Sequence, residues 1–166
     1  MSIFIDNETK VVVQGLTGEQ GKFHALRNKA YGTKVVAGTR PGKGGETVEG
    51  IPIFNTVEDA IEETGANTAM TFVPPPFAKD AVLEAAYAGC ELIVCITEGI
   101  PAKDEAEMYD LLKQKTSSRL LGPNCPGLIS PGKSNVGIMP HEITMEGKVG
   151  VVSVSYTHLT LPTNGT

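Results

Sequence analysis

Hydrophobic and polar positions follow two alternating patterns along the first 121 residues of the chain. Short runs rich in Val, Ile and Leu predict buried strands, and the segments between them have the spacing of amphipathic helices. The strand-like runs are residues 11–13, 34–37, 68–73, 91–96 and 119–121, and the helical segments are residues 20–30, 57–64, 78–88 and 103–115. Strands separated by helices form a parallel sheet through right-handed crossovers. We therefore predict an α/β fold with a Rossmann-like, doubly wound sheet, whose ligand side is the edge formed by the carboxyl ends of the strands.

A glycine-rich turn follows the first strand-like run. Residues 15–21 read GLTGEQG, so the glycines have the spacing G-x-x-G-x-x-G. The dinucleotide fingerprint is G-x-G-x-x-G, and a P-loop would continue with Gly-Lys-Ser or Gly-Lys-Thr. Glycines let a ligand approach the main chain, and the helix that follows offers unpaired N–H groups to an anion. The pattern favours a phosphate-bearing ligand, and a tight strand-to-helix turn without a ligand is the alternative.

The loop after the second strand-like run carries Arg40 and Lys43 among glycines. A NAD-binding sheet would have an acidic residue here, which accepts from the ribose hydroxyls. Two cations can instead pair with an additional phosphate, as on a 3′-phospho-ADP group or on NADP. A solvated surface loop is the alternative interpretation.

Other chemically distinctive segments also fall at the predicted carboxyl edge. The prolines of residues 73–77, VPPPF, fix the backbone and can form either a rigid wall for adenine or pantetheine or a stiff turn. Glu98 can accept a proton from a ligand or cap the following helix. Cys125 invites a nucleophile hypothesis, which we reject because no His or cationic residue stands next to it in the sequence.

The charge balance narrows the class of partner. The chain has 14 basic and 19 acidic residues and a formal net charge of −5, which argues against a nucleic-acid-binding surface. No apolar run approaches the ~20 residues that span a bilayer, and the N-terminus lacks signal-peptide features. We therefore expect a cytoplasmic protein without membrane contact. The three cysteines lack metal-ligand spacing, so we expect no metal site.

Turn-forming residues concentrate after Leu121 and indicate a domain boundary there. We predict a first domain at residues 1–121. Residues 122–153 would be a linker followed by the first strand, 148–153, of a truncated second domain. Residues 154–166 would be a non-native tail. The scattered histidines, His24, His141 and His158, are expected to be structural or solvated.

Six segments together resemble the α subunits of succinyl-CoA synthetase, the ADP- or GDP-forming succinate–CoA ligase family. They are GLTGEQG at 15–21, PGKGG at 41–45, FVPPPF at 72–77, ITEGIP at 96–101, GPNCPG at 122–127 and GKVGVVS at 147–153. The resemblance covers residues 1 to about 153 and implies a CoA-binding Rossmann-like domain followed by a flavodoxin-like ligase domain. The family belongs to the tricarboxylic acid cycle and converts succinyl-CoA, phosphate and a nucleoside diphosphate to succinate, CoA and a triphosphate.

The resemblance also implies which residues contact CoA. They are Thr17, Gly18, Glu19, Gln20, Lys43, Ile96, Thr97 and Glu98, with Val73, Pro74 and Asn124 as weaker candidates. The family's phosphohistidine lies beyond the end of this chain, so no catalytic residue is assigned and we expect this fragment to be inactive alone. The family's succinate-binding tyrosine is likewise unmatched, because the sequence departs from the family after residue 153, and neither Tyr156 nor His158 replaces these groups.

In that family Mg²⁺ and ATP or GTP belong to a separate ATP-grasp β subunit, so the resemblance implies a heteromer. The sequence is also compatible with other functions. The chain can be a stand-alone CoA-binding module, or the CoA-binding domain of another ADP-forming acyl-CoA synthetase. An NADP-dependent oxidoreductase would explain Arg40 and Lys43, but it leaves the VPPPF and ITEGIP segments without a role.

Overall fold

A seven-stranded sheet forms the centre of the computed structural model, which describes residues 2–153. The sheet has the order β3-β4-β2-β1-β5-β6-β7, and every neighbouring pair is parallel except β3 and β4. The strands are β1 (Lys10–Gln14), β2 (Lys34–Thr39), β3 (Thr47–Val48), β4 (Ile51–Phe54), β5 (Thr68–Thr71), β6 (Leu92–Cys95) and β7 (Arg119–Leu121). The helices are α1 (Glu19–Tyr31), α2 (Val57–Thr64), α3 (Pro75–Tyr87), α4 (Ala102–Lys115) and the short 3-10 helix η1 (His141–Ile143). A separate hairpin joins β8 (Gly127–Ser130) to β9 (Ser134–Gly137).

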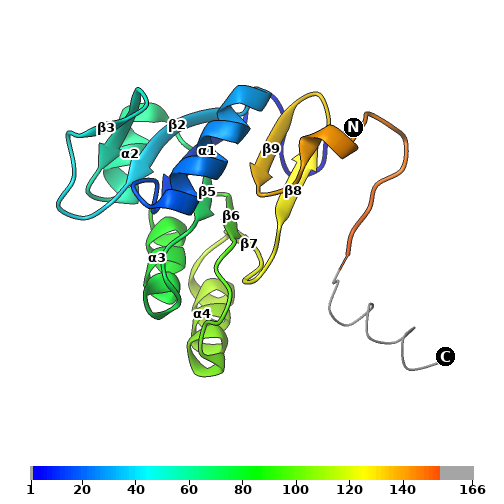
Figure 1. The fold of residues 1–166 in the computed structure, drawn as a ribbon. Helices are drawn as coiled ribbons and strands as arrows, with labels where there is room; N and C mark the ends of the chain where they lie inside the picture. Colours follow the sequence, from blue (N-terminus) through cyan, green and yellow to red (C-terminus); the bar gives the residue numbers. More distant parts are fainter. Residues whose placement is uncertain (1, 154–166) are drawn as a thin grey trace, which may run out of the picture.

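Helices cover both faces of the sheet (Figure 1). Successive strand residues point to opposite faces, so Val12 belongs to one core while Val11 and Val13 belong to the other. The first core is closed by apolar residues of α2, α3 and α4, and the second by α1 and the β8–β9 hairpin. A parallel sheet buried on both faces is the arrangement that the continuous apolar runs predicted. The predicted α/β, Rossmann-like fold is confirmed.

The connections place a topological switch point at the centre of the sheet. From β1 the chain continues to β2 and β4 on one side, and it then returns to β5 on the other side of β1. The loops that leave β1 and β5 therefore diverge to opposite faces at neighbouring strand ends. In open α/β sheets this crevice is the usual place for a ligand.

The sequence analysis missed two hairpins. Strands β3 and β4 pair across Glu49 and Gly50, which both have positive φ, 48° and 76°. The β8–β9 hairpin lies within the segment that we predicted to be a linker, and it packs on α1, where the Asn28 side-chain amide donates to the carbonyl of Gly137 at 2.9 Å. Val136 is fully buried in the same contact.

The predicted strand at residues 148–153 is wrong, because the structure assigns no strand there and Val149, Val151 and Val152 are exposed. A strand requires a neighbour that pairs with its backbone groups, and no described strand lies beside this segment. The expected tail at 154–166, with Tyr156 and His158, lies outside the described residues, and the predicted domain limits stay a prediction. Within residues 2–153, none of the helices has the length and hydropathy to cross a membrane.

Candidate functional site

The turn between β1 and α1, residues 15–18, is named the glycine loop. Gly15 has a φ of +88°, and a Cβ built on it would lie 3.2 Å from the carbonyl carbon of Phe72. A Cβ on Gly21 would collide with the carbonyl oxygen of Gly15. Gly15 is therefore required by its conformation and by close backbone approach, and Gly21 by close backbone approach alone. The loop lies directly against the end of β5, at the switch point.

Helix α1 begins immediately after this loop. Gly18 is the N-cap residue, with extended backbone and no side chain that could cap the helix, and its own N–H donates to the Gly15 carbonyl at 3.0 Å. The first helical hydrogen bond runs from the N–H of Lys22 to the Gly18 carbonyl. The N–H groups of Glu19, Gln20 and Gly21 therefore have no acceptor within the helix, because they belong to its first turn. This end of α1 carries the partial positive charge that attracts an anion.

The end of β2 is fastened to the glycine loop by two hydrogen bonds. The N–H of Gly15 donates to the Thr39 carbonyl at 3.3 Å. The Arg40 guanidinium donates from Nη1 to the Thr17 hydroxyl at 2.9 Å. The sequence analysis had placed Arg40 in a cationic loop, and the structure shows that its side chain contacts Thr17 of the glycine loop.

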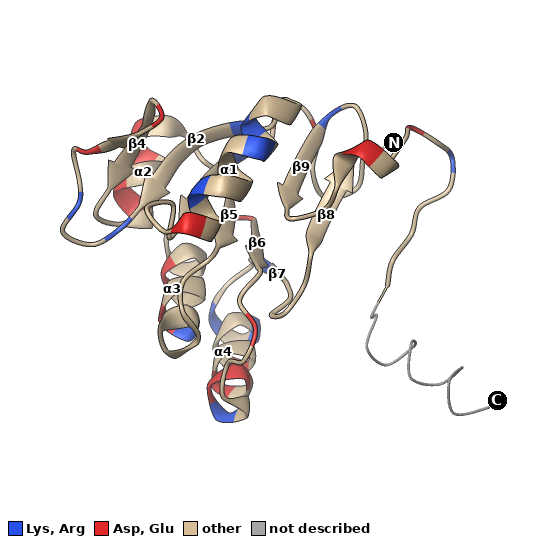
Figure 2. Ribbon diagram, in the orientation of Figure 1, with Lys and Arg blue, Asp and Glu red and all other residues tan. Residues whose placement is uncertain are grey.

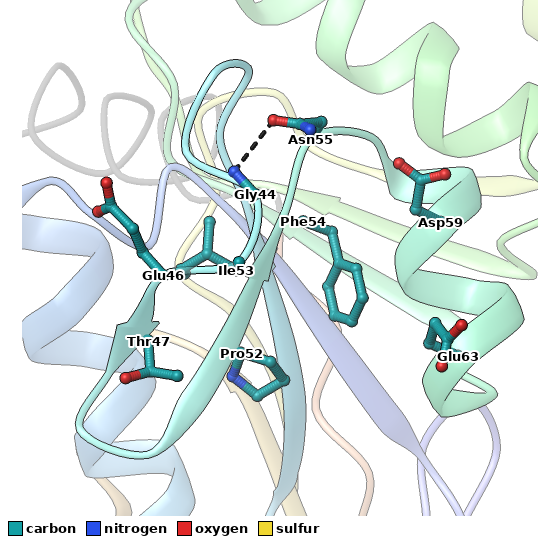
Figure 3. Close-up of a pocket in the computed structure, with 10 residues that line it drawn as sticks. Gly44, Glu46, Thr47, Pro52, Ile53, Phe54, Asn55, Asp59 and Glu63 are labelled. Carbon is teal, nitrogen blue, oxygen red and sulfur yellow. Dashed lines mark hydrogen bonds between the residues drawn. The ribbon is translucent and has the colours of Figure 1, made fainter.

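The loop after β2, residues 40–46, is shaped by a side chain that the sequence analysis did not identify. Asn55 accepts at Oδ1 from the N–H groups of Gly42 and Gly44, at 2.9 and 3.0 Å (Figure 3 shows the second bond). Lys43 is exposed, and its ammonium pairs with the Glu46 carboxylate at 2.7 Å. The predicted phosphate ligand Lys43 therefore already has an anionic partner within its own loop.

A pocket of about 410 Å³ lies behind this loop, between the β3–β4 hairpin and α2 (Figure 3). Its wall includes the carboxylates of Glu46, Asp59 and Glu63 beside the apolar side chains of Pro52 and Phe54. Three carboxylates repel a phosphate, so this pocket does not match the chemistry of the neighbouring glycine loop.

The predicted site residues after β5, β6 and β7 form a second group, the three-loop cluster of Val73, Thr97 and Asn124. The Thr97 hydroxyl donates to the Val73 carbonyl at 2.7 Å, and the N–H of Asn124 donates to the Thr97 carbonyl at 2.9 Å. Asn124 takes the left-handed conformation, with a φ of 52°. These bonds hold three loops at the same edge of the sheet.

Three further predicted residues flank this cluster. Ile96 is half-buried and its N–H donates to the Thr71 carbonyl, while Pro74 is the exposed N-cap of α3. Glu98 is exposed and does not cap α4, whose N-cap is Pro101 without a side-chain bond. Of the two interpretations of Glu98, the capping one is therefore wrong.

A buried hydrogen-bond network connects the elements next to the carboxyl edge of the sheet. Gln14, the last residue of β1, accepts at Oε1 from the Thr71 hydroxyl at 2.7 Å. Its amide donates to the Ala81 carbonyl at 2.8 Å and to the Glu84 carboxylate at 3.2 Å. Glu84 also accepts from the N–H of Val57, the first residue of α2, at 3.0 Å. The Gln14 side chain thus links β1 to β5 and α3, and through Glu84 also to α2. Gln14 immediately precedes the glycine loop.

The thiols near the edge are not activated. Burial raises the pKa of Cys125, and it raises the pKa of Cys95 to about 11, so both thiols stay protonated at neutral pH. Cys125 donates weakly to the Cys95 carbonyl at 3.4 Å. This supports the rejection of Cys125 as a nucleophile. Among the described residues no group of His, Cys, Asp and Glu is arranged to hold a metal ion.

Two of the histidines lie in aromatic contacts. His24 stacks on Phe72 with ring centroids 5.7 Å apart, and its pKa is lowered, mainly by burial and also by Arg27. The His141 ring lies 4.9 Å from that of Tyr31. We predicted structural or solvated roles for these residues, and the two aromatic contacts favour the structural role.

Comparison with known proteins adds the family. The model of the CoA binding domain matches residues 6–99, more than half of the chain. Over 158 residues the chain is 59% identical to the ADP-forming succinate–CoA ligase subunit alpha of Aquifex aeolicus, covering 95% of this chain and 52% of that protein. It is 54% identical to the malate–CoA ligase subunit alpha of Methylorubrum extorquens, with coverages of 95% and 54%. The chain thus spans about half the length of the curated relatives it matches.

A solved structure supports the fold independently. The dinucleotide-forming acetyl-coenzyme A synthetase 1 of Ca. Korarchaeum cryptofilum, in complex with phosphate and ADP, superposes with a TM-score of 0.67. The match covers 82% of this chain and 30% of that one, at 23% sequence identity. At this identity the likeness concerns the Rossmann-like architecture alone.

Proposed function

We propose, from the premise that this chain belongs to the CoA-binding domain family, that it holds CoA at the carboxyl edge of its sheet, between the glycine loop and the three-loop cluster. The observation that carries the proposal is the uncapped N-terminus of α1, next to the Arg40 guanidinium. CoA carries a diphosphate and a 3′-phosphate, and free N–H groups and an arginine are the groups that bind such anions.

The residues of this edge fit the chemistry of the CoA nucleotide. Glycines at 15, 18 and 21 leave the backbone open to a phosphate, and the side chains around Phe72 and Val73 are half-buried and apolar. Thr17, Gly18, Glu19 and Gln20 would contact the nucleotide at the helix N-terminus. Ile96, Thr97, Glu98, Val73, Pro74 and Asn124 would line the remainder of the cleft.

We further propose that the chain acts as the CoA-binding part of the α subunit of a succinate–CoA ligase. The identity to an α subunit over 95% of the chain supports this assignment. In such an enzyme an ATP-grasp β subunit is the partner, and ATP or GTP with Mg²⁺ bind on that partner. The malate–CoA ligase relative leaves malate as a second candidate acid, because its identity to this chain is nearly as high. The cytoplasm is the proposed location.

Calorimetric titration of the purified chain tests CoA binding. We expect CoA to bind more tightly than NAD, NADP or ATP, since the edge offers both a diphosphate site and apolar loops for pantetheine. NADP is the informative competitor, because it also carries an additional phosphate. Binding of NADP that equals or exceeds that of CoA would refute the proposal and favour an oxidoreductase.

A further inference from the structure

We propose that Arg40 is a phosphate-binding residue of the CoA site, the cation that meets the nucleotide where β2 and the glycine loop join. The inference rests on the proposed CoA function and adds a residue that the family resemblance does not assign. Of the two cations that the sequence analysis considered in this loop, the resemblance assigned only Lys43 to CoA, whereas the structure favours Arg40.

Backbone hydrogen bonds of Arg40 and of the preceding residue fix the position of Arg40. Its N–H donates to the Phe54 carbonyl of β4 at 3.0 Å, and the preceding Thr39 accepts from Gly15 at 3.3 Å. The guanidinium reaches Thr17 with Nη1 at 2.9 Å. A guanidinium has five N–H donors in a planar fork. One donor on Thr17 therefore orients the group beside the first turn of α1 and leaves the other donors for a ligand.

The other cations around this edge are already paired. Lys43 binds Glu46 at 2.7 Å, and Lys22 of α1 binds Glu49 at 2.8 Å. Arg40, in contrast, forms no ion pair with any carboxylate of residues 2–153. Figure 2 shows basic segments in the loop that leaves β2, and acidic ones in the turn between β3 and β4 that follows. Arg40 can therefore bind an anionic ligand without first breaking an ion pair, unlike Lys43 and Lys22.

The position also indicates which part of a nucleotide Arg40 meets. In Rossmann-like sheets the end of the second strand lies at the adenosine ribose, and an arginine there accommodates a ribose phosphate. Arg40 follows β2 directly, and through Thr17 it also borders the loop that binds a diphosphate. Arg40 would therefore bind a phosphate of the 3′-phospho-ADP moiety, either the 3′-phosphate on the ribose or the diphosphate. A ligand that lacks the 3′-phosphate distinguishes these two positions.

The test compares Arg40→Met with Arg119→Met by calorimetric titration of CoA and of dephospho-CoA, which lacks the 3′-phosphate. Arg119 is a matched control, since it begins β7 at the opposite edge of the sheet and packs on Phe4. We expect Arg40→Met to weaken CoA by about tenfold or more, the value of a lost charge-assisted hydrogen bond, and Arg119→Met to change it less than about twofold. Arg40→Lys, which keeps the charge but loses the fork, should recover part of the loss.

Dephospho-CoA locates the contact. If only CoA weakens, Arg40 binds the 3′-phosphate, and if both ligands weaken equally, it binds the diphosphate. An Arg40→Met protein that binds CoA as the wild type does overturns the inference. A wild-type chain that does not bind CoA refutes the proposed function instead, before any variant is compared.

Discussion

Replacing Gln14 by Leu should destabilise the domain through a buried polar contact rather than through a cavity. Gln14 is 1% exposed and Thr71 is fully buried, so neither side chain can find water when its partner is removed. The Thr71 hydroxyl would lose Gln14 Oε1, its one acceptor within residues 2–153, and the Ala81 carbonyl and the Glu84 carboxylate would each lose a donor. Leu has a similar volume, so packing changes little.

The magnitude follows from these contacts. A hydrogen bond contributes about 0.5–1.5 kcal/mol net, and a buried polar group left unpaired costs about 1–3 kcal/mol. We expect Gln14→Leu to lower the free energy of unfolding by about 2–4 kcal/mol, and Thr71→Val, which leaves the amide oxygen unpaired, by about 1–3 kcal/mol. The double variant replaces both partners of the bond by apolar groups, so its loss should fall short of the sum by about 1–2 kcal/mol.

Urea unfolding followed by circular dichroism measures these values, since the chain has no tryptophan to report by fluorescence. Thr68→Val on the same strand is the matched control, because the Thr68 hydroxyl bonds to Asn67 and not to Gln14. Its combination with Gln14→Leu should be additive. If the Gln14–Thr71 pair is also additive within about 0.5 kcal/mol, the reasoning about the buried bond is wrong.

Further predictions concern the exposed pair of the 40–46 loop and His24. If Lys43 contacts a phosphate of CoA, Lys43→Ala weakens binding by about 1–3 kcal/mol in calorimetry, whereas Glu46→Gln tightens it because the ammonium is released from its 2.7 Å partner. Unchanged affinity in both variants would exclude that role. The lowered pKa of His24 means that the unfolded chain binds more protons below about pH 6.5, so stability falls as the solution is acidified. His24→Phe should make the stability profile flatter between about pH 7 and pH 5, and an unchanged slope would contradict this.

The architecture was accessible from the sequence because buried strands and amphipathic helices leave strong periodic signals. The strands at residues 11–13 and 119–121 and the helices at 57–64 and 103–115 were found within a few residues. The start of α3 was missed because the helix begins with two prolines, which are tolerated at a helix N-terminus but do not contribute to an apolar periodicity. The resemblance to succinate–CoA ligase α subunits is confirmed by the identities to curated relatives.

The hairpin of β3 and β4 was missed for a different reason. Each strand is very short, so no alternation could develop, and the signal was confined to the Glu49–Gly50 turn. Two positive-φ residues are the geometry of the favoured two-residue hairpin turns, although Asn-Gly is the sequence that usually marks them. The partners of the site side chains were equally hidden. Nothing in the order of residues indicates that Lys43 turns to Glu46 while Arg40 turns to Thr17, because both choices depend on rotamers within a folded loop.

Gly15 explains how the two halves of the proposed site are held in one geometry. Its N–H bonds to Thr39, which leads into Arg40. A Cβ on Gly15 would lie 3.2 Å from the carbonyl carbon of Phe72, which leads into Val73 and the three-loop cluster. A side chain here would press on the end of β5 and would strain a backbone at φ +88°. The glycine therefore does more than admit a phosphate, because the same residue fixes the spacing between the cationic side of the cleft and the apolar side. A ligand that bridges a diphosphate and a pantetheine arm requires that spacing to be constant, and a backbone contact supplies it without depending on any flexible side chain.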